Sequence, residues 1–447
     1  MPNIVNMAKK EKNLQEELLR RKYHKPNPLY YFIYYVVGLT PLLGGKYHPH
    51  LEVKDKISDC KGPCFLIWNH QSRRDHTFLT TAAWPRRLSI VCEYNSFFRS
   101  HLHWAFKKAS ILPKKVFCPD MAGIRAMRDI IKQNGVVAFS PEGTSSIFGD
   151  NQPIVPGTGR FIKAFNIPVY CMALQGSYLT NNKISEQDRI GEVYGQLKLL
   201  FTKEDLQKLS GEEIEDIINK EFHHDDYKWN KIHHIKYDSK GLICTNLHDM
   251  LYKCPKCGTE FEMEAQGNYI RCKHCGNEAT MDDYYDFHKK DDTCVIPDTP
   301  SDWAHLERQA IIDEIRKDPN YSFSVKVKVG TLPKDHYVDK TRTTEIVGEG
   351  IYTIDHKGVH FRGTKEGKEF NFDLDYKQVM TYPMTVDLSI FSLYINEEYH
   401  DFYPEYRCVG KVLMLTEEMH RLHVNKWKNF PWFDYMYEGN ELVIDEK

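Results

Sequence analysis

The chain has 447 residues, of which 60 are Lys or Arg and 62 are Asp or Glu. This length exceeds what one hydrophobic core usually supports, which excludes a single-core protein and predicts two or three domains. Residues 1–25 show no apolar secretory signal, so we do not expect the 12 cysteines to form a disulfide framework. The net charge is −2, but basic residues are concentrated at 1–25 and 86–132. A basic surface there would attract anionic lipids and the phosphates of a carrier thioester. The alternative is that these segments are ordinary charged helices exposed to solvent.

The chain begins with a basic amphipathic segment, residues 1–27, followed by an uncharged one. Residues 26–45 contain four tyrosines together with Gly38 and Pro41. A bilayer-spanning helix needs about 20 apolar residues, so this composition favours an aromatic element lying at a membrane interface, with a core helix as the alternative. The flanking basic residues predict a peripheral or monotopic protein on the cytoplasmic face of a membrane.

Two apolar runs, at residues 64–68 and 136–139, each precede a polar loop. The runs predict buried strands, and loops that follow such strands are where α/β enzymes place their chemistry. The first loop contains His70 and Asp75. At this spacing a carboxylate can fix one imidazole nitrogen, leaving the other as a general base, and it can stabilise the imidazolium that forms.

The second loop reads Ser-Pro-Glu-Gly-Thr, and a later apolar run at 167–174 contains Pro168. The order of strand, Asn-His-x4-Asp, helix, basic segment, strand and Pro-Glu-Gly-Thr resembles the glycerolipid acyltransferase family, which makes phosphatidic acid from lysophosphatidic acid. The resemblance covers roughly residues 28–200. It implies an α/β acyltransferase domain at 28–220, with a mixed central sheet flanked by helices.

The resemblance also implies roles for individual side chains. His70 would take the proton from an acceptor hydroxyl as that oxygen attacks an acyl thioester, and Asp75 would orient His70. No covalent acyl-enzyme is required. Glu142, Gly143 and Thr144 would shape the acceptor pocket, because glycine allows backbone NH groups to approach a phosphate closely.

Two family positions differ in this chain. The family usually has an arginine after Glu-Gly-Thr and another after its second strand, but Ser145 and Pro119 stand near those places. Lys offers a point charge where Arg offers two parallel bonds, so the change could alter which head group is bound. The cations expected to replace them are Lys114, Lys115 and Arg160.

Residues 201–218 show two helical patterns that start at polar residues. The pairs His223-His224 and His233-His234 follow. They could hold a metal, but consecutive side chains point in different directions and the neighbouring residues are charged. We therefore favour a charged surface region over a metal site.

Four cysteines form two C-x2-C pairs separated by fourteen residues: Cys254, Cys257, Cys272 and Cys275. Two such turns can close a tetrahedral zinc site, and a shell of four thiolates leaves no position for substrate, so a structural zinc ribbon is expected at 245–285. Redox cysteines are the alternative. The hairpin expected between the pairs contains the acidic segment 260–264, which disfavours a nucleic-acid partner because its carboxylates repel a phosphate backbone.

Residues 300–447 predict a helix followed by a β domain. Ser301 is a plausible N-cap of a helix that ends near Lys317, and period-two alternation begins at residue 323. Several antiparallel strands and a terminal helix at 409–427 would complete a domain similar to the pleckstrin-homology superfold. Its role would be lipid, protein or intramolecular docking.

The leading hypothesis is a membrane-associated O-acyltransferase with acyl-CoA or acyl-carrier protein as donor. The lysophospholipid acceptor is expected to be 1-acylglycerol 3-phosphate, giving phosphatidic acid. One alternative is an acyltransferase for glycerol 3-phosphate or another lyso-lipid. Another is a non-catalytic membrane adaptor that uses the zinc ribbon and β domain, although an adaptor does not need His70 paired with Asp75.

Overall fold

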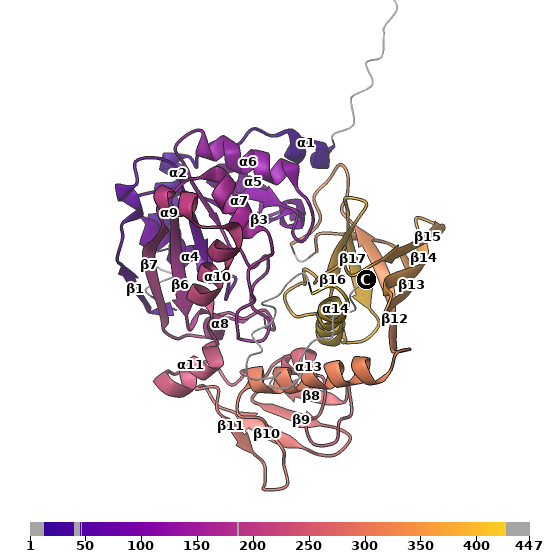
Figure 1. The fold of residues 1–447 in the computed structure, drawn as a ribbon. Helices are drawn as coiled ribbons and strands as arrows, with labels where there is room; N and C mark the ends of the chain where they lie inside the picture. The colour runs from indigo at the N-terminus through magenta and orange to yellow at the C-terminus, as the bar shows by residue number, and fades with distance from the viewer. Residues whose placement is uncertain (1–12, 40–44, 46, 186, 341, 426–447) are drawn as a thin grey trace, which may run out of the picture.

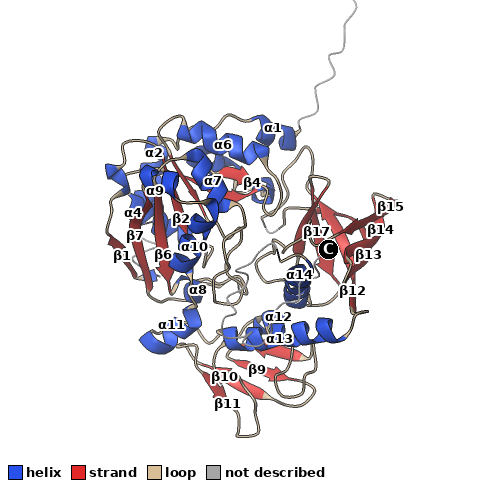
Figure 2. Cartoon of the chain, in the orientation of Figure 1, coloured by secondary structure: helices blue, strands red, loops and turns tan. Residues whose placement is uncertain are grey.

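The computed structural model describes residues 13–39, 45, 47–185, 187–340 and 342–425 (Figure 1). The first part of the predicted segment 1–27 and the end of the predicted helix 409–427 lie outside the described residues. The described chain contains a seven-stranded, a four-stranded and a six-stranded sheet (Figure 2). Within these ranges, no helix combines the length and apolar character needed to cross a bilayer.

The first sheet has the strand order β1-β7-β6-β2-β5-β3-β4. Strands β4, β3, β5, β2 and β6 are parallel, whereas β7 runs antiparallel to β6 and parallel to β1. The mixed central sheet is therefore confirmed. Its strands are β1 (Pro49–Val53), β2 (Cys64–Trp68), β3 (Leu88–Glu93), β4 (Leu112–Lys114), β5 (Val136–Phe139), β6 (Val169–Gln175) and β7 (Val193–Phe201).

Helices cover both faces of this sheet, which explains why β2 is buried throughout. Phe65 and Ile67 pack on the side of α6, α7 and α10, whereas Leu66 and Trp68 pack on the side of α4. The helices of this region are α4 (Asp75–Ala83), α5 (His103–Ala109), α6 (Met121–Ile131), α7 (Thr158–Phe165), α8 (Ser177–Thr180), α9 (Lys203–Lys208), α10 (Gly211–Phe222) and α11 (Asp226–His233), with 3-10 helices η3 (Ile57–Asp59) and η4 (Tyr94–Phe98).

Two short helices precede the sheet. The side chains of Asn13 and Asn27 cap α1 (Leu14–Arg20) and α2 (Pro28–Ile33), and α2 continues into a π-helix, η1 (Tyr34–Leu39). One face of the continuous α2–η1 element is apolar and exposed, with side chains at helical spacing: Leu29, Phe32, Ile33 and Val36. Exposed apolar side chains repeated along one face indicate a surface that faces something other than water.

The four-stranded sheet belongs to the cysteine-rich segment. Strands β8 and β9 form the hairpin predicted between the two cysteine pairs, and β10 pairs with β9 and β11. The helix α12 precedes them. The elements are α12 (Leu247–Met250), β8 (Met263–Gln266), β9 (Tyr269–Cys272), β10 (Glu278–Met281) and β11 (Phe287–Lys289).

The C-terminal region consists of α13, a six-stranded antiparallel sheet and α14, as the sequence predicted. The sheet order is β15-β14-β13-β12-β17-β16. The likeness to the pleckstrin-homology superfold stays a prediction. The elements are α13 (Pro300–Lys317), β12 (Ser322–Thr331), β13 (Glu345–Asp355), β14 (Gly358–Lys365), β15 (Lys368–Leu374), β16 (Phe391–Ile395), β17 (Glu398–Pro404) and α14 (Val409–His423).

The start of α13 differs from the prediction. Thr299 is the N-cap, because its side chain accepts a hydrogen bond from the backbone NH of Asp302. Ser301 lies inside the first turn, and its hydroxyl donates to the Asp225 carboxylate at 2.7 Å. The predicted stop is confirmed, since the helix ends with Asp318 as C-cap. Thr299 followed by Pro300 at the first helical position is the usual start of a helix.

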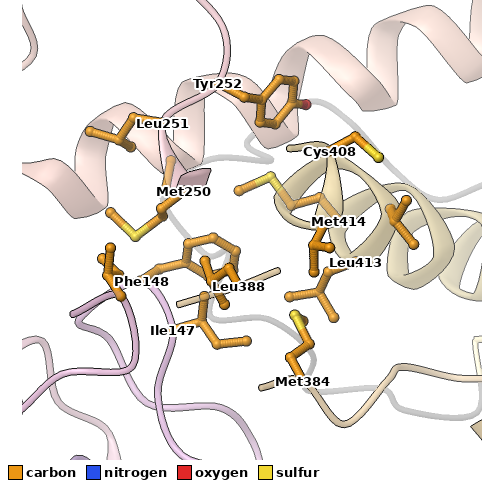
Figure 3. Close-up of a cluster of buried hydrophobic side chains, with 14 of the residues drawn as sticks. Ile147, Phe148, Met250, Leu251, Tyr252, Met384, Leu388, Cys408, Leu413 and Met414 are labelled. Atoms are coloured by element: carbon orange, nitrogen blue, oxygen red, sulfur yellow. The ribbon is translucent and has the colours of Figure 1, made fainter. Parts of the chain in front are cut away.

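One buried cluster joins all three regions (Figure 3). Ile147 and Phe148, from the loop after β5, pack with Met250 near the zinc ribbon and with Leu388 and Leu413 of the C-terminal region. A core that runs through the junction holds the regions together, so the second half of the chain directly supports a loop of the first. The boundaries at 27, 220, 245–285 and 300 stay a prediction.

Candidate active site

The two polar motifs meet at the carboxyl edge of the first sheet. Strands β2 and β5 are adjacent and parallel, so the loops that follow them, residues 69–75 and 140–146, emerge side by side. The loops are also bonded directly, because the backbone NH of Ser146 donates to the carbonyl of His70 at 2.7 Å. The meeting of the two motifs thus follows from strand order.

His70 and Asp75 form the expected pair. His70 Nδ1 lies 2.8 Å from Asp75 Oδ2, at the start of α4. A carboxylate only accepts, so the imidazole hydrogen lies on Nδ1 when the ring is neutral. The His70 side chain is 29% exposed, and no described residue bonds to its Nε2. This nitrogen is therefore available to accept a proton.

The Asp75 carboxylate is held from several sides. It accepts hydrogen bonds from the backbone NH groups of Gln71 and Ser72 and from the Ser72 hydroxyl. The hydroxyl of Ser177, which follows β6, donates to Oδ1 at 2.7 Å. These bonds fix the carboxylate so that it can orient His70. Ser177 could not be identified from the sequence, because it lies 102 positions from Asp75 and in no recognisable motif.

Asn69 ties the end of β2 to β6. Its Nδ2 donates to the Leu174 carbonyl at 2.8 Å, and its Oδ1 accepts from the Leu174 NH at 2.7 Å. The side chain thus imitates a strand neighbour where β2 leaves the sheet. These two hydrogen bonds therefore fix the position of the next residue, His70, relative to this edge of the sheet.

Glu142 contacts the backbone of His70. It is fully buried, its Oε2 accepts the His70 NH at 3.1 Å, and Oε1 lies 3.5 Å from Asn151 Nδ2. Burial raises the pKa of Glu142 well above its ordinary value, although the bond from the His70 NH opposes this. In this arrangement Glu142 helps to fix the loop of residues 69–75, which contains His70.

Gly143 and Thr144 follow in the same loop. Gly143 has φ of +80°, and a Cβ there would lie 2.9 Å from the Phe117 ring, so glycine is required for both conformation and space. Thr144 is buried, and its hydroxyl accepts a hydrogen bond from Lys183 Nζ at 2.9 Å. Lys183 lies between α8 and β7, and no pattern in the sequence singled it out.

The three cations expected to bind phosphate lie in different surroundings. Lys115 Nζ donates to the carbonyl of Glu397 in the β16–β17 hairpin at 2.9 Å. Lys114 Nζ is 4.0 Å from Asp120, and burial lowers the pKa of Lys114. Arg160 is exposed on α7, with its stem against Gly211. None of these described contacts brings the three cations to His70.

The four predicted metal ligands do converge. Their Sγ atoms lie within 4.8 Å of one another, with 3.7 Å between Cys254 and Cys275 and 3.8 Å between Cys257 and Cys272. A tetrahedral zinc with Zn–S bonds of ~2.3 Å requires about 3.8 Å between sulfurs, so the residues fit this metal. Zinc would hold the two cysteine turns together and contribute folding energy. The histidine pairs form no comparable cluster within the described residues.

A basic groove lies near the N-terminal helices, away from His70. Its volume is about 1180 Å³. Gln133, just before β5, lines it, so the groove lies toward the amino ends of the parallel strands. The charged lining residues are Glu16, Glu17, Arg20, Arg21, Lys22, Lys25, Arg87, Lys107 and Lys108.

Comparison with known proteins is consistent with the geometry at the sheet edge. Residues 48–175 match the family model described as Acyltransferase. This segment is an acyltransferase domain. It contains His70, Asp75 and the Glu142 loop, whereas Lys183 lies beyond its matched end. Residues 248–278, with the four cysteines, match the model described as DNA directed RNA polymerase, 7 kDa subunit.

Among solved structures, the chain is similar to the crystal structure of the 1-acyl-sn-glycerophosphate (LPA) acyltransferase, PlsC, from Thermotoga maritima. The identity is 16%, the match covers 42% of this chain and 73% of that chain, and the TM-score is 0.32. No curated protein matches the chain significantly.

Proposed function

We propose that this protein transfers a fatty acyl group from an acyl thioester to the hydroxyl of a lysophospholipid. The preferred acceptor is 1-acylglycerol 3-phosphate, the product is phosphatidic acid, and the donor is acyl-CoA or acyl-carrier protein. The observation that carries the proposal is the 2.8 Å contact between His70 Nδ1 and Asp75 Oδ2 within an acyltransferase domain. An imidazole oriented in this way activates a hydroxyl without a covalent intermediate.

In the proposed reaction, His70 Nε2 takes the proton of the acceptor hydroxyl as its oxygen bonds to the thioester carbonyl carbon. Asp75 stabilises the imidazolium that results. The tetrahedral intermediate then collapses, the carbon–sulfur bond breaks, and the departing thiolate receives the proton from His70. An ester and a free thiol are formed, and His70 returns to its starting state.

We also propose that the protein binds the surface of a membrane without crossing it, on the cytoplasmic face. The exposed apolar side chains of α2–η1 support this, since Leu29 is 68% exposed. Trp104, also exposed, contacts Tyr30 at a ring distance of 5.6 Å and widens the patch. Pro28 of α2 also lines the basic groove. An apolar face beside a basic groove suits anionic lipid headgroups.

The activity is tested by thiol release from acyl-CoA with lysophosphatidic acid as acceptor. His70→Ala should lower acceptor-dependent thiol release at least ~100-fold, the usual scale of general-base catalysis. His234→Ala, which changes an exposed histidine at the C-terminal end of α11, is the matched control and should retain the rate. Equal rates for wild type and His70→Ala would show that His70 is not the base.

A further inference from the structure

The side chain of Lys183 is a buried cation with one hydrogen-bond partner among the described residues. Its residue exposure is 6%, and its Nζ donates to Thr144 Oγ1 at 2.9 Å. Among the described residues, no carboxylate oxygen lies within 4.0 Å of this nitrogen. Burial lowers the pKa of Lys183, and the negative charge of Glu93 at the end of β3 opposes that effect. The ammonium thus lacks the close counter-charge that buried lysines normally have.

An ammonium group has three donors, and a buried one is stable when acceptors surround it. The Thr144 hydroxyl supplies one acceptor. The remaining N–H donors of Lys183 are suited to an anion such as phosphate, because phosphate oxygens supply several acceptors and a counter-charge together. In a place shielded from water, the attraction between phosphate and ammonium is stronger than at the surface.

Lys183 contacts the loop of residues 140–146, which is bonded to His70. Thr144 lies between Glu142, whose carboxylate accepts the His70 NH, and Ser146, whose NH donates to the His70 carbonyl. Lys183 therefore contacts the loop that bonds to both sides of the His70 backbone. The segment between β15 and β16 also contacts Lys183, because the Asp387 NH donates to the Lys183 carbonyl at 2.8 Å.

We propose that Lys183 binds the phosphate group of a substrate of this site, and specifically the phosphomonoester of the acceptor. The inference rests on the proposed function. It assigns the positive charge to a residue outside both motifs and outside the acyltransferase family match, which ends at residue 175. The phosphates of a coenzyme A donor offer the same chemistry, and the test below separates the two sources.

The test compares Lys183→Met and Lys183→Arg, with Lys208→Met, an exposed lysine on α9, as control. Thiol release is measured with lysophosphatidic acid and with monoacylglycerol, which lacks the phosphate. Lys183→Met should raise the KM for lysophosphatidic acid about 10- to 100-fold, the loss expected for one charge-assisted bond. Lys183→Arg should restore most of the affinity. Lys183→Met should change the rate with monoacylglycerol much less than the rate with lysophosphatidic acid, because monoacylglycerol has no phosphate for Lys183 to bind.

Other outcomes are equally informative. A rise in the KM for acyl-CoA alone would assign the phosphate to the donor and overturn the acceptor assignment. A fall in kcat with both acceptors and no change in either KM would overturn phosphate binding altogether. Binding of lysophosphatidic acid is also measured by calorimetry. If lysophosphatidic acid binding falls in Lys183→Met but wild type shows no turnover, the proposed reaction alone is contradicted. If wild type turns over and Lys183→Met binds lysophosphatidic acid equally well, this inference alone is contradicted.

Discussion

Two buried carboxylates surround His70 and contact different parts of it. Asp75 bonds to the ring through Nδ1, so it influences the proton that the ring carries. Glu142 bonds to the backbone NH, so it influences where the ring stands. A site that must hold a base within a fraction of an ångström of its substrate depends on both kinds of support.

Replacement of Glu142 separates its charge from its hydrogen bond. Glutamine keeps an oxygen that can accept the His70 NH and removes only the negative charge, which burial already disfavours by raising the pKa of Glu142, so Glu142→Gln should retain most of the activity. Glu142→Ala leaves the His70 NH unpaired and should lower kcat roughly 10-fold or more, with a smaller change in KM. Steady-state thiol release measures both. A glutamine variant as slow as the alanine variant would mean that the charge itself is required.

At the scale of elements, the α2–η1 helix offers the simplest test of membrane binding. Leu29→Ser combined with Phe32→Ser removes two exposed apolar side chains, and it should lower the fraction that floats with phosphatidylglycerol vesicles roughly 10-fold. Ile232→Ser on α11, where the native residue is 81% exposed, is the matched control. Equal flotation of all three proteins would contradict a role for this face. Equal binding to phosphatidylcholine and phosphatidylglycerol vesicles would contradict a role for the basic groove in binding anionic headgroups.

The zinc ribbon gives a second prediction at this scale. Removal of zinc by a chelator should increase amide hydrogen exchange in residues 254–281, because the four thiolates no longer close the two turns. Acyl transfer should fall less than this local protection, since the metal shell contains no catalytic position. Hydrogen exchange and thiol release are measured on one sample. Complete loss of activity while exchange stays unchanged would place the metal in the reaction.

Local elements could be predicted from the sequence, and long-range contacts could not. The strands β2 and β5 and the β8–β9 hairpin follow from apolar runs and cysteine spacing, which are local signals. The cap of α13 was misplaced by two residues, because Thr299 and Ser301 are both good caps and only the fold decides between them. Lys115 and Glu397 are 282 positions apart in the sequence, and local hydrophobic patterns carry no information about contacts between such distant residues.

At the scale of the whole molecule, charged groups are buried both inside the C-terminal region and where it meets its neighbour. Inside that region, Arg308 on α13 forms ion pairs with Glu417 and Glu418 on α14 at 2.8 and 3.1 Å, and all three side chains are buried. Between regions, Asp249 on α12 has a weaker partner, since Arg407 lies 3.4 Å away and neither carboxylate oxygen has a hydrogen bond from the described part of the chain. Burial raises the pKa of Asp249 to about 7, with Arg407 opposing the shift.

This shift predicts a pH dependence of stability. Asp249 takes up a proton on folding between its unfolded pKa of about 4 and its folded pKa of about 7. Its contribution is therefore most favourable below pH 4, is lost as pH rises to 7, and is constant above. Asp249→Asn should match wild type near pH 4 and be more stable at pH 8, by up to roughly 4 kcal/mol. Thermal unfolding at both pH values measures this. A difference that does not change with pH would contradict the assignment.

The core shared by Ile147, Phe148 and Leu413 has a consequence during synthesis on the ribosome. Ile147 and Phe148 emerge long before the residues between 384 and 419 that pack on them. A nascent chain must therefore carry these apolar side chains uncovered while the intervening residues are synthesised. The proposed acyl transfer should begin only after residues 384–419 have emerged and packed, so chains truncated before residue 384 should be inactive.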